Sequence, residues 1–296
     1  MSASVGVNEA QNPSSTAGTL FLVPTPIGNL ADISERAIRV LTEVNWIAAE
    51  DTRHSKPLLQ HIGSKARMFA LHEHNEQDKL EHIIGLLKSG ESIALISDAG
   101  TPLISDPGFV IVRACRQQRL PVVPLPGPCA ITTALSGAGL PTDRFTFEGF
   151  LAAKSQQRIK QLEALLQEPR TLVFYESPHR ILHSLQALDE VFGEQREVVL
   201  ARELSKQFET FLSGSAAELR QRLMDDPNQQ RGEMVLMVAG YSASAQPQDC
   251  PQPPAQKALA LLCQELPLKK AAALVAQLYD ERKNALYQWG LKNLNN

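Results

Sequence analysis

The feature that most constrains the fold is an alternation of short apolar segments with amphipathic segments, which begins at Thr19. Helical periodicity separates the apolar segments, most clearly over residues 75–89 and 107–118. Strands that alternate with helices build a mostly parallel sheet covered on both faces, so this half is predicted to be α/β. The predicted strands are 19–24, 46–49, 68–71, 92–97 and 121–125.

The chain after Leu140 follows a different pattern, in which several predicted strands come close together and indicate a second, mixed sheet. Strands are predicted over 171–175, 197–203, 208–213 and 234–239, and helices over 178–192 and 218–224. A length of 296 residues suits two α/β domains and an appendage. We therefore expect a disordered tail (1–18), an N-terminal α/β domain (19–128), a C-terminal α/β domain (129–240), a linker (241–254) and a basic helical module (255–296).

Composition excludes several classes of protein. Hydrophobic residues make up 43% and charged residues 21%, as in an ordinary globular enzyme. No apolar run reaches the ~18–20 residues of a membrane span, and the N-terminus does not resemble a secretory signal. The four cysteines are scattered, which favours reduced thiols over disulfides or a zinc site. We expect a cytoplasmic protein with no membrane segment and no metal.

The C-terminal segment is more basic than the rest of the chain. It holds six Lys or Arg side chains and three Asp or Glu side chains, whereas the whole chain has a net charge of −3. Such a module suits a polyanionic partner, although a solvated helix face gives the same pattern. Its expected core is Leu259, Leu262, Leu266, Leu268, Ala272, Val275 and Leu278.

Three loops rich in Pro, Gly and small residues follow predicted strands, over residues 23–32, 97–108 and 124–131. Ligands bind beyond the carboxyl ends of strands in open α/β sheets, so three such loops predict a ligand crevice. The first loop lacks the dinucleotide and phosphate-loop motifs. Asp98 can accept hydrogen bonds from a ribose or an amine, or offset a positive charge. Asp32 and Asp106 fit helix N-caps, and for Asp106 this structural role and a contact with a ligand stay equally open.

These loops, in this order, resemble those of the tetrapyrrole methylase family, and in particular a bacterial branch of it that modifies ribosomal RNA. Segments 48–54 (AAEDTRH), 71–76 (LHEHNE), 174–180 (FYESPHR), 201–206 (ARELSK) and 231–235 (RGEMV) are also similar to that branch. The similarity extends over roughly residues 20–239. The basic helical tail resembles the branch's C-terminal helix-turn-helix module.

The resemblance implies a homodimer whose two α/β domains enclose S-adenosylmethionine, held largely by backbone groups. The implied reaction is methylation of the 2′-hydroxyl of a cytidine in the decoding region of small-subunit (16S) ribosomal RNA. Carried over by position, the cofactor contacts are Pro26, Ile27, Asp98, Thr101, Cys129, Ala130, Ile131, Tyr175, Ala201 and Met234.

Methyl transfer from a sulfonium is an in-line displacement, so the enzyme must align the nucleophile, exclude water and help to remove a proton. No spacing identifies the base. The candidates are Glu50, His72, Glu176, His179 and Lys206. His72 and His74 are expected on opposite sides of a strand, which argues against a shared metal.

Basic side chains near the predicted strand ends and on the tail are candidates for contacts with RNA phosphates. They are Arg53, His54, Arg180, Arg202, Lys269, Lys270 and Lys283. Ion pairing at the surface is the alternative for the arginines, and packing or dimerisation is the alternative for the tail. Two other functions stay open: a C-methyltransferase of tetrapyrroles such as cobalamin precursors, and a non-catalytic RNA-binding assembly factor.

Overall fold

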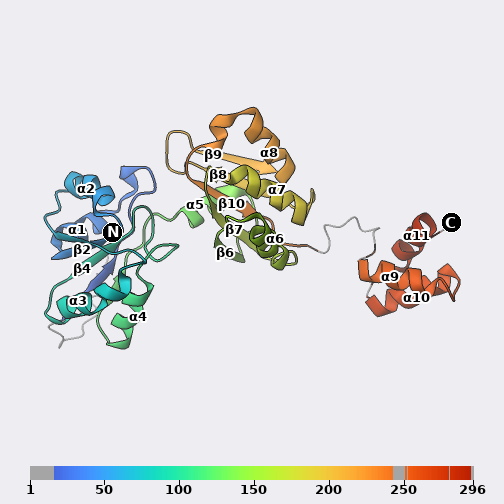
Figure 1. Ribbon diagram of the computed structural model, residues 1–296, viewed down its shortest axis with the longest axis horizontal. Coiled ribbons are helices and arrows are strands. Elements are labelled where there is room, and N and C mark those ends of the chain that lie inside the picture. The colour runs from blue at the N-terminus through green and yellow to red at the C-terminus, as the bar shows by residue number, and fades with distance from the viewer. Residues whose placement is uncertain (1–16, 243–250, 252, 280, 295–296) are drawn as a thin grey trace, which may run out of the picture.

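The computed structural model describes residues 17–242, 251, 253–279 and 281–294, and these residues form two sheets and a group of helices (Figure 1). The first sheet is entirely parallel and has the strand order β3-β2-β4-β1-β5, so the predicted parallel sheet is confirmed. Its strands are β1 (Leu20–Leu22), β2 (Trp46–Ala49), β3 (Arg67–Ala70), β4 (Ile93–Ile96) and β5 (Val122–Pro124).

Helices cover both faces of this sheet. On one face α1 (Glu35–Glu43) and α2 (Thr52–His61) pack around Leu41 and Leu59. On the other face α3 (Glu76–Lys88) and α4 (Phe109–Gln117) pack around Leu87 and Ile111. Burial from both sides explains why all four residues of β4 are apolar rather than alternating.

Two predicted helix caps are wrong. Asp32 does not cap α1, because it ends a 3₁₀ helix (Leu30–Asp32), and Ser34 accepts the Ala37 N–H at 3.1 Å instead. Asp106 does not cap α4, because Pro107 and Gly108 intervene before that helix begins. Oε1 of Glu76 accepts the N–H groups of Val110 (2.7 Å) and Ile111 (3.2 Å), so a side chain distant in sequence caps α4.

The second sheet is mixed, as predicted, with the order β6-β7-β10-β8-β9. Its strands are β6 (Phe145–Phe150), β7 (Thr171–Glu176), β8 (Val198–Arg202), β9 (Thr210–Gly214) and β10 (Met234–Val238). Strand β6 runs parallel to β7, and the other pairs are antiparallel. The sequence did not predict β6, which lies at the sheet edge and carries polar residues and Gly149 in its second half.

Three helices cover one face of the second sheet: α6 (Ser155–Ala164), α7 (Ile181–Phe192) and α8 (Ala216–Asp225). A short 3₁₀ helix (Pro227–Gln230) follows α8. The other face packs against α5 (Ala130–Ala138) and against Ile27 from the first loop. The side chains of β10 alternate between the two faces: Leu236 packs in the core under α6, α7 and α8, and Val235 packs in the core beside α5. The face that carries Val235 therefore looks toward the first domain.

The C-terminal helices are α9 (Pro253–Leu262), α10 (Leu268–Tyr279) and α11 (Lys283–Asn293), which share a small core. Most of the predicted core residues lie in it, but Leu278 is 73% exposed and that prediction is wrong. The expected tail up to residue 16 and most of the expected linker lie outside the described residues. Cys115, Cys129 and Cys263 are free thiols. Within the described ranges, every helix is too short or too polar to cross a membrane.

Candidate active site between the two sheets

Three loops form one rim at the carboxyl edge of the first sheet. They follow β1, β4 and β5, which are neighbours in the order β4-β1-β5. Backbone hydrogen bonds between Thr25 and Gly100 (2.9 and 3.0 Å) join the first loop to the second. The Thr101 hydroxyl donates to the Pro128 carbonyl oxygen at 2.9 Å and joins the second loop to the third. The predicted convergence of the three loops is therefore present.

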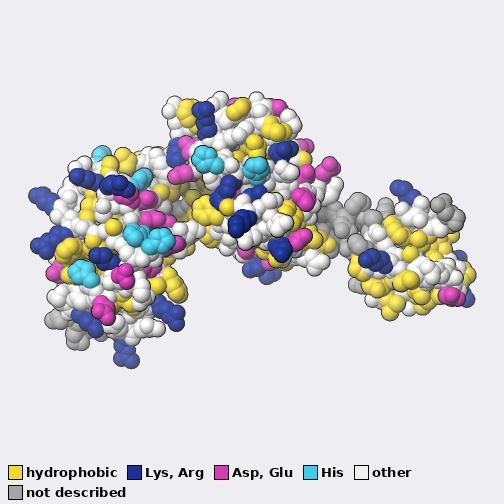
Figure 2. Space-filling model, in the orientation of Figure 1, with side chains coloured by type: hydrophobic (Ala, Val, Ile, Leu, Met, Phe, Trp, Pro, Cys, Tyr) yellow, Lys and Arg dark blue, Asp and Glu magenta, His cyan; other side chains and the backbone are white. Residues whose placement is uncertain are grey.

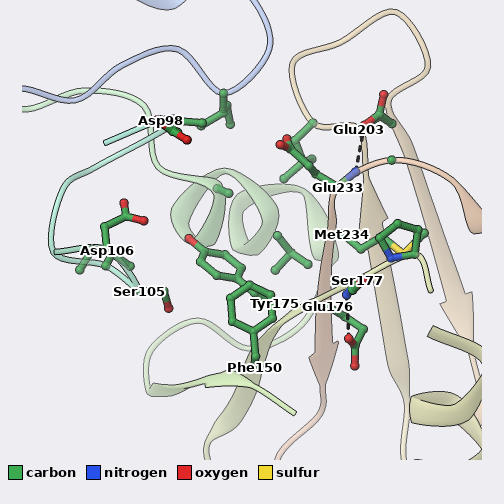
Figure 3. A pocket seen from close by; sticks show the side chains of 18 of the residues that line it. Asp98, Ser105, Asp106, Phe150, Tyr175, Glu176, Ser177, Glu203, Glu233 and Met234 are labelled. Carbon is green, nitrogen blue, oxygen red and sulfur yellow. Dashed lines mark hydrogen bonds between the residues drawn. The ribbon is translucent and has the colours of Figure 1, made fainter. Parts of the chain in front are cut away.

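A cleft of about 540 Å³, the first cleft, opens between this rim and the second sheet. This volume lies within the roughly 300–1,000 Å³ of small-molecule sites. Figure 3 shows Asp98 and Asp106 on the rim side and Tyr175 and Met234 on the side of the second sheet. Other lining residues are Ile27, Glu50, Ala99, Thr101, Ile104, Ser105, Ala130, Phe150, Ser177, Pro178, Glu203, Leu204, Lys206, Gly232, Glu233 and Val235.

The rim side of the first cleft is acidic. Burial raises the pKa of Glu50, and the neighbouring Asp98 raises it further against a backbone hydrogen bond that lowers it. Burial also raises the pKa of Asp106 to about 7, against a hydrogen bond from Ser97 that lowers it, and the charges of Glu50 and Asp98 raise it further. Carboxyl groups that repel one another are relieved by a bound cation. This wall therefore suits a positively charged ligand.

The opposite wall of the first cleft is largely apolar. The rings of Tyr175 and Phe150 lie 5.6 Å apart, and those of Tyr175 and Phe147 lie 4.9 Å apart. Burial raises the pKa of the Tyr175 hydroxyl well above its ordinary range, so this group stays neutral. Met234 and Ile27 extend the apolar surface. One ligand can thus place a cationic group on the rim and an apolar or flat group against the second sheet.

A second cleft, of about 560 Å³, adjoins the first. The two share Ile27, Asp98, Ala99, Lys206 and Glu233, so they meet at these residues. The remaining lining comes from the first loop, from α2 and from the start of the second loop, and consists of Thr25, Pro26, Gly28, Leu30, Arg53, His54, Ser55, Pro57, Leu58 and Ser97.

Lys206 lies at the junction of the two clefts. Its Nζ donates to Glu203 Oε1 at 2.9 Å and to Glu233 Oε2 at 3.0 Å. Burial alone lowers the pKa of Lys206, but the two carboxylates outweigh it and the pKa is raised. The side chain passes close to Gly28, where an added Cβ would lie 2.3 Å from Lys206 Cγ. Lys206 is therefore a fixed ammonium group and a poor base.

Backbone strain is concentrated on both sides of the clefts. Among the described residues, the non-glycine residues with positive φ include Leu103 (73°) and Ser105 (64°) in the second loop. They also include Glu203 (52°) and Ser205 (67°) on the second domain. The Ser205 hydroxyl is hydrogen-bonded to Asp32 and ties the two domains together. Left-handed non-glycine residues cost free energy and cluster at functional sites, which supports this region as the site.

Of the candidate bases, Glu50 and Lys206 line the first cleft. Glu176 also borders this cleft, but its carboxylate is fully buried, pairs with Arg180 (3.3 Å) and accepts from Ser177 N (2.6 Å) and the Ser184 hydroxyl. Figure 3 shows this carboxylate turned away from the cleft. These contacts argue against proton transfer by Glu176.

The two histidine candidates, His72 and His179, are outside the lining of both clefts. The prediction that His72 and His74 face opposite sides is wrong, because β3 ends at Ala70 and a turn brings their rings to 6.0 Å. No group of His, Cys, Asp and Glu able to hold a metal occurs among the residues that the structure describes.

Most of the expected cofactor contacts come together. Ile27, Asp98, Thr101, Ala130, Tyr175 and Met234 line the first cleft. Pro26 lines the second cleft, and Cys129 lines a neighbouring hollow of about 390 Å³. The side chains of Ile131 and Ala201 are buried in the core that contains Ile27, so they can offer a ligand only backbone groups. Asp106, for which the sequence left a cap and a ligand contact equally open, also lines the first cleft, and so do Phe150, Glu203 and Glu233, which were not among the expected contacts.

The expected RNA contacts separate into exposed and buried groups. Arg53 and His54 line the second cleft, and Arg180 lies 5.9 Å from the Phe150 ring. Arg202 is only 6% exposed, and its guanidinium donates to the carbonyl oxygens of Arg231, Phe208 and Asn228. These bonds already use the donors of Arg202, which argues against a contact between this side chain and RNA.

Lys269, Lys270 and Lys283 are exposed on α10 and α11. Figure 2 shows Lys and Arg side chains interspersed with Asp and Glu on the visible face of both α/β domains, rather than gathered in one patch.

Comparison with known families and proteins places the chain. The family described as "Tetrapyrrole (Corrin/Porphyrin) Methylases" matches residues 19–220, and the "RsmI C-terminal HTH domain" matches residues 251–294. Among solved structures, the chain is similar to uroporphyrin-III-C-methyltransferase from Thermus thermophilus (TM-score 0.54, 20% identity, 75% of this chain and 94% of that one). It is also similar to diphthine synthase (TM-score 0.58, 14% identity, 77% and 92%). At these identities the likeness shows the fold alone.

Two curated relatives are much more similar in sequence, and both are named ribosomal RNA small subunit methyltransferase I. The protein from Escherichia coli O157:H7 is 56% identical over 97% of this chain and 99% of its own length. The protein from Pseudomonas aeruginosa is 56% identical over 94% of this chain and 98% of its own length. The chain belongs to the tetrapyrrole methylases and, within them, to the family of ribosomal RNA small subunit methyltransferase I.

Proposed function

We propose that the chain transfers a methyl group from S-adenosylmethionine to the ribose 2′-hydroxyl of a cytidine in the decoding region of small-subunit ribosomal RNA. The observation that carries this proposal is the junction of two clefts at Ile27, Asp98 and Lys206. One cleft suits a cationic cofactor, and the other adds basic and apolar side chains from the first loop and α2 to the Asp98 and Glu233 that both clefts share. The names of the relatives support the RNA substrate.

The first cleft fits S-adenosylmethionine in charge and in shape. The acidic rim, with Glu50, Asp98 and Asp106, complements the sulfonium and ammonium charges. The apolar wall of Ile27 and Met234 suits the adenine ring and the aliphatic carbons of the cofactor. The cofactor, when bound, supplies an electrophilic methyl group on a sulfonium.

The residues of the chain must then align the ribose oxygen and accept its proton. In the transfer, the O–H bond breaks, an O–CH₃ bond forms and the S–CH₃ bond breaks, so one proton is released. We assign Glu50 as the proton acceptor, because it lines the first cleft and burial has raised its pKa, which makes its carboxylate a stronger base. The Lys206 ammonium is placed to hold the attacking oxygen or a neighbouring phosphate.

A tetrapyrrole substrate is the nearest alternative, because the solved structures of similar fold include tetrapyrrole methyltransferases. Their sequence identities of 20% and 13% carry no information on substrate. A non-catalytic assembly factor is the other alternative. The acidic and strained loops of the first cleft speak against it, since such costly features serve no purpose in a cleft that binds nothing.

The oligomeric state and the location are parts of the same proposal. The family resemblance implies a homodimer, and a ribosomal RNA substrate implies that the protein works in the cytoplasm. Light scattering on a size-exclusion column measures the mass of the particle against the 32.5 kDa of one chain. A particle of one chain's mass at micromolar concentration would contradict the dimer.

A direct test compares methyl acceptors. The purified protein is incubated with methyl-labelled S-adenosylmethionine and one of three acceptors: undermethylated small subunits, naked 16S RNA or uroporphyrinogen III. We expect label on ribosomal RNA and none on the tetrapyrrole. Label on the tetrapyrrole alone would contradict the proposal, and no label on any acceptor despite measurable cofactor binding would favour the assembly factor.

A further inference from the structure

We infer that the second cleft is the pocket for the target nucleotide, which enters it turned out of the RNA, and that the buried Ser55 hydroxyl hydrogen-bonds this nucleotide. The inference rests on the proposed function, because it assigns a place to the substrate of that reaction. It concerns residues of α2, on the side of the junction away from the first cleft.

Ser55 carries the first part of the argument. The residue lines the second cleft and is only 4% exposed, and its buried Oγ has no hydrogen-bond partner among the described residues. Buried hydroxyls are almost always hydrogen-bonded, so an unpaired one that borders a cleft indicates a partner that arrives with a ligand. A hydroxyl can donate to or accept from a base edge or a sugar oxygen.

The walls of the second cleft suit a nucleotide. Pro26, Pro57 and Leu58 line it with apolar surface, and Leu30 does so while remaining 50% exposed. Flat bases extruded from RNA bind against such surfaces, with polar groups reading the base edge. The volume of about 560 Å³ is that of a small-molecule site.

The rim of the same cleft carries cationic side chains for the phosphates. The Arg53 side chain is 90% exposed, and its guanidinium pairs at 2.9 Å with Asp51. An ion pair this exposed is weak, so a phosphate can replace it at little cost. His54 adjoins Arg53 in the lining, and Lys206 lines the same cleft at its junction with the first cleft.

The position of the cleft completes the argument. Ile27, Asp98 and Lys206 belong to both clefts, so a nucleotide in the second cleft has its sugar beside the ligand of the first. The third hollow also adjoins Ile27, but Asp32 and Glu209 give it acidic walls and neither Lys nor Arg lines it. A polyanion is therefore better accommodated on the side of α2.

The test uses the full-length protein and undermethylated small subunits, and measures kcat, KM and cofactor Kd separately. Ser55→Ala and Arg53→Ala should each lower kcat/KM for subunits about tenfold, the effect of one lost hydrogen bond to a charged or buried partner. Leu58→Trp, which fills the cleft, should lower it further. Cofactor Kd should stay unchanged in all three variants, which also shows that they are folded.

Two matched controls lie outside the clefts. Lys56→Ala removes an exposed charge from the same helix, and Ser89→Ala removes a hydroxyl that already bonds its own helix at Leu86. Both should leave kcat/KM unchanged. If the wild-type protein methylates subunits and the three cleft variants match it, the inference is overturned while the proposed function stands. If the wild-type protein labels no RNA, the proposed function itself has failed.

Discussion

At the scale of single residues, the site is defined by carboxyl groups whose positions cost stability. Asp98 accepts the Asp51 N–H at 3.1 Å and faces the first cleft near Glu50 and Asp106. The sequence pointed to Asp98, because it follows a buried strand in a small-residue loop. It left Asp106 open between a cap and a ligand contact, and it could not point to Ser55, because the importance of both residues depends on burial and on neighbours far away in the chain.

We expect Asp98→Asn to weaken cofactor binding about tenfold, because it removes a negative charge while it keeps an oxygen for the Asp51 N–H. Calorimetric titration with S-adenosylmethionine measures the Kd. Asp78→Asn, at an exposed position on α3, is the matched control and should bind normally. An unchanged Kd in Asp98→Asn would remove Asp98 from the cofactor site.

Asp106 makes stability depend on pH. Its pKa is about 7 in the folded protein and near its ordinary 3.8 in the unfolded chain, so between these values folding takes up a proton. The free energy of unfolding therefore falls as the pH rises from about 4 to 7. Asp106→Asn should be more stable than wild type at pH 8, with a smaller advantage at pH 5, in urea unfolding. The exposed control Asp143→Asn should show no such dependence, and an equal advantage at both pH values would contradict the account.

At the scale of elements, the hydrophobic pattern located most strands and helices, and it located their boundaries where a strand is apolar throughout. The buried strands β2 and β4 were predicted to within a residue of each end, because they are continuously apolar between polar loops. The edge strand β6 was missed, because only one side of it packs and its pattern is weak. Of the two wrong caps, the one at α1 is a shift of two residues, from Asp32 to Ser34, whereas the one at α4 is replaced by a tertiary contact. Glu76, which caps α4 from α3, has no local sequence signature.

Glu76 should therefore be important for the second loop, since α4 begins directly after it. Glu76→Ala leaves two buried N–H groups without a partner and should destabilise the protein by about 2–3 kcal/mol. Urea unfolding gives the value. Glu81→Ala, exposed on the same helix, should cost less than about 0.5 kcal/mol. Equal effects of the two substitutions would mean that the cap does not stabilise α4.

At the scale of the whole molecule, the two sheets build the clefts and the C-terminal helices form a separate core. The order of the first sheet, β3-β2-β4-β1-β5, brings the three loops together, and this could be expected from the rule for open parallel sheets. The contribution of the second domain could not be expected in the same way. Tyr175, Glu203 and Lys206 reach the site through a mixed sheet, and the sequence did not predict the strand order of that sheet.

Deleting residues 256–296 should weaken the use of RNA and leave cofactor Kd unchanged, because α9–α11 pack on one another around Leu259 and Val275. Their exposed Lys269, Lys270 and Lys283 would supply phosphate contacts. We expect KM for subunits to rise at least tenfold in methyl-transfer kinetics. A full-length variant with these lysines changed to Glu is the control for charge. Equal loss of cofactor and RNA binding on deletion would show that the tail is needed only for folding.

The central claim is that the acceptor is a ribose oxygen of small-subunit RNA. The most direct measurement is digestion of enzymatically labelled RNA, followed by mass spectrometry of the nucleosides and alkaline hydrolysis of the labelled fragment. A 2′-O-methyl group blocks cleavage of the adjoining phosphodiester by alkali. The account predicts label in 2′-O-methylcytidine within an alkali-stable dinucleotide. Label on a base, or on a dinucleotide that alkali cleaves, would contradict it.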